Sequence, residues 1–427
     1  MQEGLYLSVI RIQGLHCLKG KINIQGSKNA VLPVMAASLL HRGTVVITNV
    51  PGIQDVYCMM GILNYLGCEC RMKDHELTIC SERASVGQIP GELAGQMRSS
   101  IMLLGPLLGR FKEAVTSHPG GCSIGKRPID LHLHGLKELG ADIRVEGERI
   151  TGSTMGLLGA EIVFPFPSVG ATENIIMAAV AAQGTTVLSG AAKEPEIETL
   201  CLFLQEMGAR IKGIGTSQLT IEGGADLHDV TFAIPGDRIV AGTYLGAVMC
   251  SGGDVLLAGA PVRHMDENIR LARRMGAEVS IRPEGLFVRM EGRPEAADFA
   301  TGPYPEFSTD LQSVMMAVAS IADGTSFIRE TVFEKRFSTA KELQKLGAHI
   351  IIDGRTACVE GRFPLDGGTA QALDLRGGAA LVVAGLAAAR ETEVGGYIHI
   401  SRGYEDICRD LSSVGARIAL VETEETD

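Results

Sequence analysis

The sequence predicts an α/β fold of six similar units, which divide into two domains of three. The first observation behind this prediction is a repeat: the pattern L-x-x-[LMV]-G-[AC]-x-[IV], or a close variant, occurs six times in 427 residues. The second is that each copy joins helical spacing, a glycine and a β-rich run. The third is the chain length, which is typical of two or three domains.

The six copies are spaced almost evenly along the chain. Their shared glycines lie 68 to 73 residues apart, so six units account for the whole sequence. One copy alone is a common helix ending, but six at this spacing indicate a repeated architecture. Such a repeat indicates no chemistry by itself. The glycines are Gly67, Gly140, Gly208, Gly276, Gly347 and Gly415.

Each unit contains a second pattern upstream of its glycine. Most copies follow an Ala-rich helix, a Gly-Thr-like turn and a strand, as in AASLLHRGTVVITNV and AAVAAQGTTVLSGA. One unit is therefore a helix, a strand, a second helix and one or two further strands. Units this long and varied are not typical of a regular solenoid.

The composition is that of a globular protein. Hydrophobic residues make up 45% of the chain, and many of its 53 glycines adjoin Ala, Val or Leu rather than Ser. A net charge of −11, with no run of five Lys or Arg, argues against a nucleic-acid-binding surface. The N-terminus lacks a signal-peptide pattern and no stretch has the ~18–20 apolar residues that span a bilayer, so we expect a cytoplasmic protein.

The ten cysteines are scattered along the chain and do not form a disulfide or zinc pattern. Cys68 and Cys70 form a C-x-C pair without a second pair or a matched histidine, so we expect no metal site. His132 and His134 alternate with leucines in DLHLHGL. We interpret these two histidines as one face of a strand or of a helix start, not as metal ligands.

The stretch HPGGCSIGKRP at residues 118–128 is close to a phosphate-binding P-loop. Arg127 stands where a hydroxyl would hold Mg²⁺, and Pro128 disfavours helical geometry at Arg127, which argues against a nucleotide-hydrolysing site. What remains is a glycine-flanked loop with Cys122 among basic residues. Positive neighbours lower the pKa of a thiol, so Cys122 is a candidate reactive cysteine; a turn cysteine without a chemical role is the alternative.

Other polar segments lie at the edges of apolar helices. GSKN at 26–29 presents Lys28 and Asn29, unless Ser27 only caps the following helix. Arg98 lies near the start of an apolar helix, where a charge is costly without a partner. PSVGATEN offers Ser168 and backbone N–H groups to an anion.

Three further charged residues complete this set. Asp310 begins a helix in FSTDLQ, where a purely structural role is equally typical. Arg376 and Arg402 each lie beside glycine at the edge of an apolar segment. A lysine, several arginines, a thiol and a carboxylate together suit an anionic substrate and proton transfer.

These motifs, in this order along nearly the whole chain, resemble the enolpyruvyl transferases, in the branch that acts on UDP-N-acetylglucosamine. The matching segments include GSKNAVLP, PGGCSIGKRPIDLHLHGLKELGA, PSVGATEN, KEPEIE, PEFSTDLQ, ETVFEKRF, DLRGGAALVVAGL and SRGYEDI. The Cys122 loop is the most specific, because the sister family that makes 5-enolpyruvylshikimate 3-phosphate lacks this cysteine. The resemblance implies a two-domain inverted (inside-out) α/β barrel with the active site in the interdomain cleft. One domain would comprise residues 28–235, and the other residues 1–27 and 236–427.

The resemblance also implies the reaction. The enolpyruvyl group of phosphoenolpyruvate passes to the 3-hydroxyl of UDP-N-acetylglucosamine with release of phosphate, by addition and elimination through a tetrahedral ketal. This is the first committed step of peptidoglycan synthesis and uses no cofactor. We expect a cytoplasmic monomer that binds these two substrates and binds neither nucleic acid nor a membrane. We also expect fosfomycin-type epoxides to alkylate Cys122.

Residue roles follow from the resemblance, position by position. Cys122 would protonate the methylene carbon of phosphoenolpyruvate and can bind it covalently, and Asp310 would take the proton from the sugar hydroxyl. The implied catalytic residues are Cys122, Asp310, Lys28 and Arg402. The implied phosphoenolpyruvate contacts are Lys28, Arg98, Arg127 and Arg402, with Arg376 near its carboxylate or the intermediate and Asn29 near the sugar or phosphoenolpyruvate. The implied UDP-sugar contacts are Arg127, Pro128, Ile129, Asp130, Leu131, Ser168, Val169, Gly170, Asp310 and Val332.

Two departures from the family and two alternative functions stand beside this interpretation. Some family members carry lysines near the positions of Gln54 and Phe166, so the resemblance does not fix the uridine and diphosphate contacts.

One alternative is the sister shikimate-pathway enzyme, which Cys122 disfavours. The other is a non-catalytic UDP-sugar-binding paralogue that regulates the pathway. Such a protein would be expected to lose Cys122, Asp310 or an arginine, and all are present.

Overall fold

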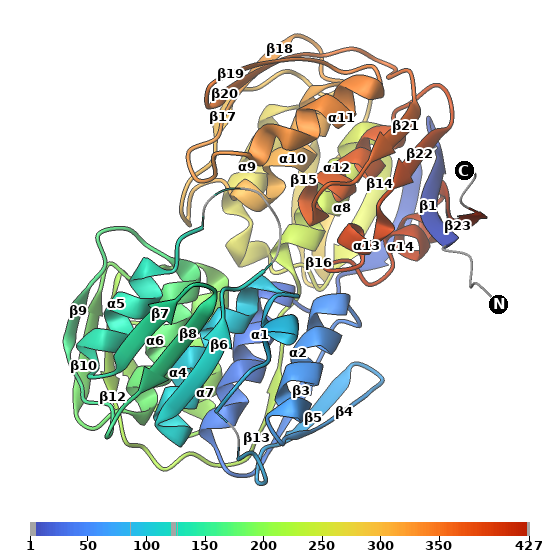
Figure 1. The fold of residues 1–427 in the computed structure, drawn as a ribbon. Coiled ribbons are helices and arrows are strands. Elements are labelled where there is room, and N and C mark those ends of the chain that lie inside the picture. Colours follow the sequence, from blue (N-terminus) through green and yellow to red (C-terminus); the bar gives the residue numbers. More distant parts are fainter. Residues whose placement is uncertain (1–5, 86, 121–124, 126, 425–427) are drawn as a thin grey trace. The chain divides into compact units, whose positions relative to one another are not determined.

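The computed structural model describes residues 6–85, 87–120, 125 and 127–424. Contacts divide the chain into two compact units. We call residues 26–120 and 127–235 the N-terminal unit, and residues 6–25 and 236–424 the C-terminal unit (Figure 1). The domain boundaries that the resemblance implies, 28–235 for one domain and 1–27 with 236–427 for the other, stay a prediction.

The N-terminal unit contains three sheets in the described part of the chain. Their strand orders are β13-β3-β5-β4, β6-β8-β7 and β11-β12-β10-β9. The strands are β3 (Thr44–Thr48), β4 (Glu69–Lys73), β5 (Glu76–Cys80), β6 (Glu113–Ser117), β7 (Asp142–Glu146), β8 (Arg149–Ser153), β9 (Glu161–Val163), β10 (Thr185–Ser189), β11 (Arg210–Lys212), β12 (Gln218–Glu222) and β13 (Val230–Ala233).

Helices of two kinds accompany these sheets. Helices α1, α4 and α6 are apolar on nearly all sides and form the interior, whereas α2, α5 and α7 keep an exposed face. The helices are α1 (Lys28–Ala37), α2 (Gln54–Tyr65), α3 (Gly91–Ala94), α4 (Leu104–Phe111), α5 (Asp130–Glu138), α6 (Val169–Ala181) and α7 (Pro195–Glu206), with 3₁₀ turns η1 (Ser38–Leu40) and η2 (Arg98–Leu103).

The C-terminal unit repeats this plan. Its described sheets have the strand orders β21-β22-β1-β23, β15-β16-β14-β2 and β17-β18-β20-β19. The strands are β1 (Tyr6–Gln13), β2 (Leu18–Asn23), β14 (Gly253–Ala258), β15 (Glu278–Arg282), β16 (Gly285–Met290), β17 (Phe299–Ala300), β18 (Thr325–Arg329), β19 (His349–Asp353), β20 (Thr356–Glu360), β21 (Gly368–Gln371), β22 (Thr392–Gly395) and β23 (Arg417–Glu424).

Three buried helices fill the interior of this unit: α8, α10 and α12 contact one another, and sheets lie outside them (Figure 1). The expected inside-out arrangement, with helices inside and sheets outside, is confirmed in each unit. The helices are α8 (Arg238–Ser251), α9 (Asp266–Arg274), α10 (Gln312–Ala319), α11 (Thr339–Lys345), α12 (Leu375–Gly385), α13 (Tyr397–Ile400) and α14 (Ile407–Ser413), with 3₁₀ turns η3 (Val262–His264), η4 (Thr309–Leu311) and η5 (Arg336–Ser338).

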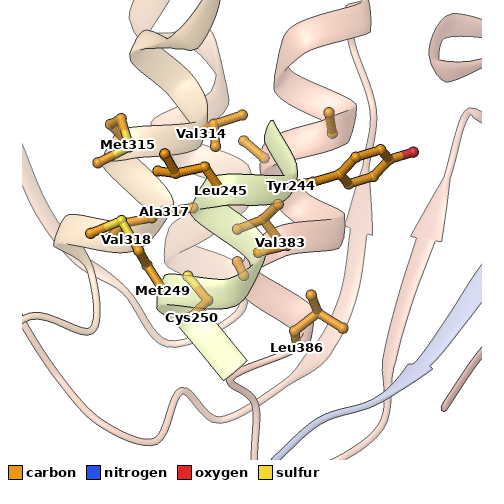
Figure 2. Close-up of a cluster of buried hydrophobic side chains, with 14 of the residues drawn as sticks. Tyr244, Leu245, Met249, Cys250, Val314, Met315, Ala317, Val318, Val383 and Leu386 are labelled. Carbon is orange, nitrogen blue, oxygen red and sulfur yellow. The ribbon is translucent and has the colours of Figure 1, made fainter. Parts of the chain in front are cut away.

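The side chains between the inner helices form a continuous apolar core. Figure 2 shows Leu245 and Met249 of α8 directed toward Val314 and Val318 of α10, with Val383 of α12 nearby. All five are at most 1% exposed. Burial of such side chains contributes roughly 1.5–3 kcal/mol each, so this contact holds the inner helices together.

The repeated glycines adopt the conformation that their pattern predicts. All six have φ between +88° and +110°, the left-handed region that lets a helix end and a strand begin. The prediction of six glycine-capped helices is thereby confirmed. In the part of the chain that the structure describes, no helix is long and apolar enough to cross a membrane.

Candidate active site

The Asp310 carboxylate is held by two arginines in the C-terminal unit. Asp310 lies in η4, where its backbone N–H donates to the Ser308 hydroxyl. Nη2 of Arg336 donates to Oδ1 at 2.6 Å, and Nη2 of Arg376 donates to Oδ2 at 3.3 Å. Nε of Arg336 also donates to the Thr309 carbonyl. The carboxylate is therefore fixed in one orientation, while its side chain remains 26% exposed.

Arg376 is almost completely buried at the start of α12. Asp374 caps this helix and accepts from the backbone N–H groups of Arg376 and Gly377, which fixes the arginine backbone. Burial by itself lowers the pKa of Arg376, but the charge of Asp310 and the nearby Tyr404 hydroxyl raise this pKa above its ordinary value. Nη1 is buried and has no hydrogen-bond partner in the described part of the chain. One donor of this guanidinium is thus available to an anion.

Glu330 connects the Asp310 segment with Val332. Its carboxylate accepts from the Thr309 hydroxyl at 3.0 Å and from the backbone N–H groups of Val332 and Phe333 at 2.8 and 2.9 Å. Glu330 is 1% exposed and directly follows β18. Two segments of the predicted site are therefore joined by a residue that the sequence analysis did not select.

Of the predicted catalytic residues Arg402 and Cys122, the structure describes only Arg402. Arg402 lies half-buried on the loop between α13 and α14. Cys122 and Lys126 lie outside the described residues. The catalytic roles of Cys122 and Arg402 stay predictions.

Lys28 and Asn29 begin α1 in the N-terminal unit and meet acidic partners there. Nζ of Lys28 lies 2.7 Å from Oδ2 of Asp55, and both side chains are largely buried. Nδ2 of Asn29 donates to Oε1 of Glu196 at 3.5 Å. Ser27 caps α1 by accepting from the Ala30 N–H, so the structural reading of that serine is confirmed.

Arg98 holds the backbone at Arg127. Its Nη2 donates to the Arg127 carbonyl and, at 3.4 Å, to the Pro128 carbonyl. Burial and the charge of Arg127 lower the pKa of Arg98 to about 10. Arg127 has a φ of +42°, a strained conformation that fits the expectation that Pro128 keeps it out of a helix.

His132 is a buried, neutral histidine in α5. Burial, Arg98 and Arg127 lower its pKa to about 3. Asn174 accepts from the Gly105 N–H through Oδ1 at 2.6 Å, so its Nδ2 must donate to Nδ1 of His132 at 3.1 Å. The proton of His132 is therefore on Nε2. His134 is exposed, so the expectation that both histidines share one face is wrong: side chains two apart on a helix point apart.

The start of α6 contacts His132. Ser168 caps this helix by accepting from Ala171, and Val169 and Gly170 form its first turn, where backbone N–H groups lack partners within the helix. A Cβ atom at Gly170 would lie 3.1 Å from Cε1 of His132. Glycine therefore allows α6 and α5 to approach, and His132 connects the predicted contacts at 127–131 with those at 168–170.

The remaining predicted contacts surround the start of α5. Ile129 is its buried N-terminal cap residue, Asp130 is exposed in its first turn, and Leu131 is half-buried. Gln54 begins α2 and is exposed, and Phe166 is 53% exposed. Among residues 6–85, 87–120, 125 and 127–424, no group of His, Cys, Asp or Glu is arranged to hold a metal ion.

The sequence does not reveal the partners of the selected residues. Asp55 and Glu196 each lie in the first turn of a helix, where acids are typical, and this position hides their ion-pair and hydrogen-bond roles. Glu330 and Arg336 both belong to ETVFEKRF, a motif whose pattern indicates no role for either side chain.

Comparison with protein families gives one match over most of the chain. The family model of EPSP synthase (3-phosphoshikimate 1-carboxyvinyltransferase) matches residues 12–411. A Sorangium cellulosum protein named UDP-N-acetylglucosamine 1-carboxyvinyltransferase is 46% identical, over 97% of this chain and 98% of that protein. A protein of the same name from Zymomonas mobilis is 44% identical over 96% of this chain and 99% of that protein.

Solved structures share the fold at lower identity. The enolpyruvyl transferase NikO from Streptomyces tendae aligns with a TM-score of 0.89 at 23% identity, over 98% of this chain and 100% of that chain. EPSP synthase from Acinetobacter baumannii aligns with a TM-score of 0.75 at 19% identity, over 97% and 100% of the two chains. These two likenesses support the fold assignment.

Proposed function

Because this chain belongs to the EPSP synthase family and, within it, to the UDP-N-acetylglucosamine 1-carboxyvinyltransferases, we propose that it transfers the enolpyruvyl group of phosphoenolpyruvate to the 3-hydroxyl of UDP-N-acetylglucosamine. The other product is inorganic phosphate. The reaction would commit this sugar nucleotide to peptidoglycan synthesis.

The clamped Asp310 carboxylate is the observation that carries this proposal. A carboxylate held by Arg336 and Arg376 keeps a fixed direction and remains partly exposed, as a proton acceptor for a substrate hydroxyl must be. The unpaired Nη1 of Arg376 adds a buried donor. Leaving such a donor unsatisfied costs about 1–3 kcal/mol, which a carboxylate or phosphate oxygen would offset.

The proposed reaction has an addition step and an elimination step. In the addition, the sugar 3-oxygen bonds to C2 of phosphoenolpyruvate, its proton passes to Asp310, and C3 receives a proton from Cys122 to become a methyl group. In the elimination, the methyl group returns a proton to the Cys122 thiolate, the bond between C2 and the phosphate oxygen breaks, and the departing phosphate takes the proton that Asp310 had accepted. These steps release phosphate and leave the enolpyruvyl ether.

Basic residues would stabilise the negative charge of both substrates. Lys28, Arg98, Arg127 and Arg402 are proposed to contact phosphoenolpyruvate, because guanidinium groups match the geometry of phosphate and carboxylate. The backbone N–H groups at the start of α6 are proposed to bind the diphosphate of UDP-N-acetylglucosamine. His132 is neutral and adds no charge to this part of the site.

The proposed function is tested by phosphate release. We expect phosphate only when phosphoenolpyruvate and UDP-N-acetylglucosamine are both present, because neither addition nor elimination proceeds with one substrate. Each substrate alone is the control. Release with shikimate 3-phosphate in place of the sugar nucleotide would instead indicate the shikimate-pathway reaction, and binding of UDP-N-acetylglucosamine without phosphate release would indicate a non-catalytic paralogue.

We also propose that the protein acts in the cytoplasm, since both proposed substrates are small soluble metabolites, and that it is a monomer. Light scattering coupled to size-exclusion chromatography measures the mass in solution directly. A mass of 45.2 kDa is expected, and twice that value would contradict the monomer.

A further inference from the structure

A buried carboxylate lies beside the turn that carries Asp310. Glu330 is 1% exposed, and in the described part of the chain its carboxylate has three hydrogen-bond partners, all of them neutral. These partners are the Thr309 hydroxyl and the backbone N–H groups of Val332 and Phe333. Burial of a charge without an opposite charge beside it is costly, so a carboxylate at this position calls for an explanation.

The backbone of Glu330 is fixed by two neighbouring segments. Its N–H donates to the Arg355 carbonyl at 2.9 Å, and Nη1 of Arg355 donates to the Thr331 carbonyl at 2.8 Å. The N–H and the hydroxyl of Thr331 donate to the hydroxyl and the carbonyl of Thr301, at 3.0 and 2.7 Å respectively. The Glu330 side chain therefore extends from a firmly held backbone, and the groups bound to its carboxylate are held in turn.

The two oxygens of this carboxylate hold different segments. Oε2 accepts from the Thr309 hydroxyl at 3.0 Å, and Thr309 directly precedes Asp310 in η4. Oε1 accepts from the N–H groups of Val332 and Phe333 at 2.8 and 2.9 Å. One side chain thus fixes the position of the Asp310 turn relative to the backbone at Val332.

A neutral side chain of the same shape could not make all three bonds. Each bond requires an acceptor, and the three are divided between two separate oxygen atoms. Glutamine has the shape of glutamate but offers only one acceptor atom, because its other terminal atom is an NH2 donor. The need for two acceptor atoms explains why a charged residue occupies this buried position.

We propose that Glu330 is a positioning residue: its Oε2 atom holds the turn that carries Asp310, and its Oε1 atom holds the backbone at Val332. The inference rests on the proposed function, in which Asp310 accepts the proton of the sugar hydroxyl and Val332 contacts the sugar nucleotide. Because Glu330 is buried, it acts on the reaction through these two residues.

Steady-state phosphate release tests the bond at Oε2. Thr309→Val removes the hydroxyl but keeps the side-chain shape, and we expect kcat to fall about tenfold, as for one lost hydrogen bond that holds a catalytic group. The KM for UDP-N-acetylglucosamine should stay close to that of the wild type, because the bonds at Val332 remain. Thr309→Ser keeps the hydroxyl and should retain the wild-type kcat, and Thr325→Val, at an exposed position on β18, is the control. A folded Thr309→Val protein with the wild-type kcat would overturn the proposal.

A double-mutant cycle tests whether Glu330 and Thr309 act as one unit. In Glu330→Gln the amide oxygen can still accept from Val332 and Phe333, but the NH2 group cannot accept from Thr309. We expect this variant to lose about as much kcat as Thr309→Val. The double variant should be no slower than either single variant, because both changes break the same bond. Losses that add in the double variant would show that the two residues act independently, which contradicts the proposal.

Amide hydrogen exchange separates this proposal from the proposed function, because it needs no turnover. In Thr309→Val we expect the Asp310 N–H to exchange faster than in the wild type, whereas the N–H groups of Val332 and Phe333 should exchange as in the wild type. Unchanged exchange at Asp310 would overturn the proposal whether or not the protein releases phosphate. A wild type that releases no phosphate would contradict the proposed function instead, and exchange at Asp310 would then decide whether Glu330 holds the turn.

Discussion

At the scale of single residues, the candidate site depends on charged side chains whose partners hold them still. Arg336 is 2% exposed and binds both the Asp310 carboxylate and the Thr309 carbonyl. The carboxylate of Asp310, the proposed proton acceptor, has the direction that Arg336 and Arg376 impose. On this proposal Arg336 would act on the reaction through Asp310.

The role of Arg336 leads to a kinetic prediction. Arg336→Lys keeps the charge but loses the planar fork that joins Asp310 to Thr309, and we expect kcat to fall roughly 100-fold, as for a small misplacement of a catalytic group. Steady-state phosphate release measures this effect. Arg329→Lys, at an exposed position on β18, is the control and should leave kcat unchanged. Equal kcat values in the two variants would contradict the positioning role.

His132 leads to a prediction about stability and pH. Its pKa is about 3 in the folded protein and about 6.5 when unfolded, so the unfolded chain binds more protons between these values. The contribution of neutral His132 to the free energy of unfolding is therefore complete above pH 6.5. It falls by about 1.4 kcal/mol for each pH unit of acidification below that value.

We therefore expect His132→Gln to lose less stability than the wild type between pH 6.5 and pH 5. Urea unfolding at both pH values measures the difference. His134→Gln is the matched control, because that histidine is exposed on the same helix. Parallel losses in the wild type and in His132→Gln would contradict a depressed pKa.

At the scale of elements, the selected residues gather at helix starts. Lys28 begins α1, Ser168 caps α6, and Arg376 is the second residue of α12. Helix starts combine unpaired N–H groups with a positive dipole end, and short polar motifs such as GSKN and PSVGATEN mark them in the sequence. The local pattern is therefore enough to predict these positions.

The partners across elements could not be predicted in the same way. Asp55 lies 27 residues from Lys28, and Glu196 lies 167 residues from Asn29. Nothing in either local sequence indicates which helix starts meet, because that depends on how the helices pack. The alternation in DLHLHGL suggested a shared face because it fits a strand, but the segment forms helix α5, in which side chains two apart point apart, so His132 is buried and His134 is exposed.

The contact between α5 and α6 gives a prediction at this scale. Gly170→Ala places a Cβ atom 3.1 Å from His132, which cannot yield because it is buried and bound by Asn174. We expect the KM for UDP-N-acetylglucosamine to rise about tenfold, equivalent to 1.4 kcal/mol. Gly61→Ala, in α2 with nothing within 4 Å of the new atom, is the control. A KM as low as that of the control would show that the two helices tolerate the added methyl group.

At the scale of the whole molecule, each unit has an apolar core of its own. One buried cluster contains residues of the C-terminal unit such as Leu245, and a second contains residues of the N-terminal unit such as Ile175. The sixfold repeat predicted this division into threes, because three glycine-capped units complete one set of inner helices and outer sheets. The placement of β1 and β2 in the C-terminal unit has no counterpart in the repeat.

Separate cores predict separate thermal transitions. Leu245→Ala and Ile175→Ala each remove a large buried side chain and should cost about 2–5 kcal/mol in their own unit. In differential scanning calorimetry, we expect each substitution to shift a different component of the unfolding endotherm. One common shift of a single transition in both variants would contradict independent cores.

The position of the first two strands has a consequence for synthesis. β2 pairs with β14, and β1 pairs with β22 and β23, which are made last. As the nascent chain leaves the ribosome, residues 26–235 can fold while β1 and β2 still lack partners. A chaperone that shields strand edges would therefore engage β1 longest, until β22 and β23 have been made.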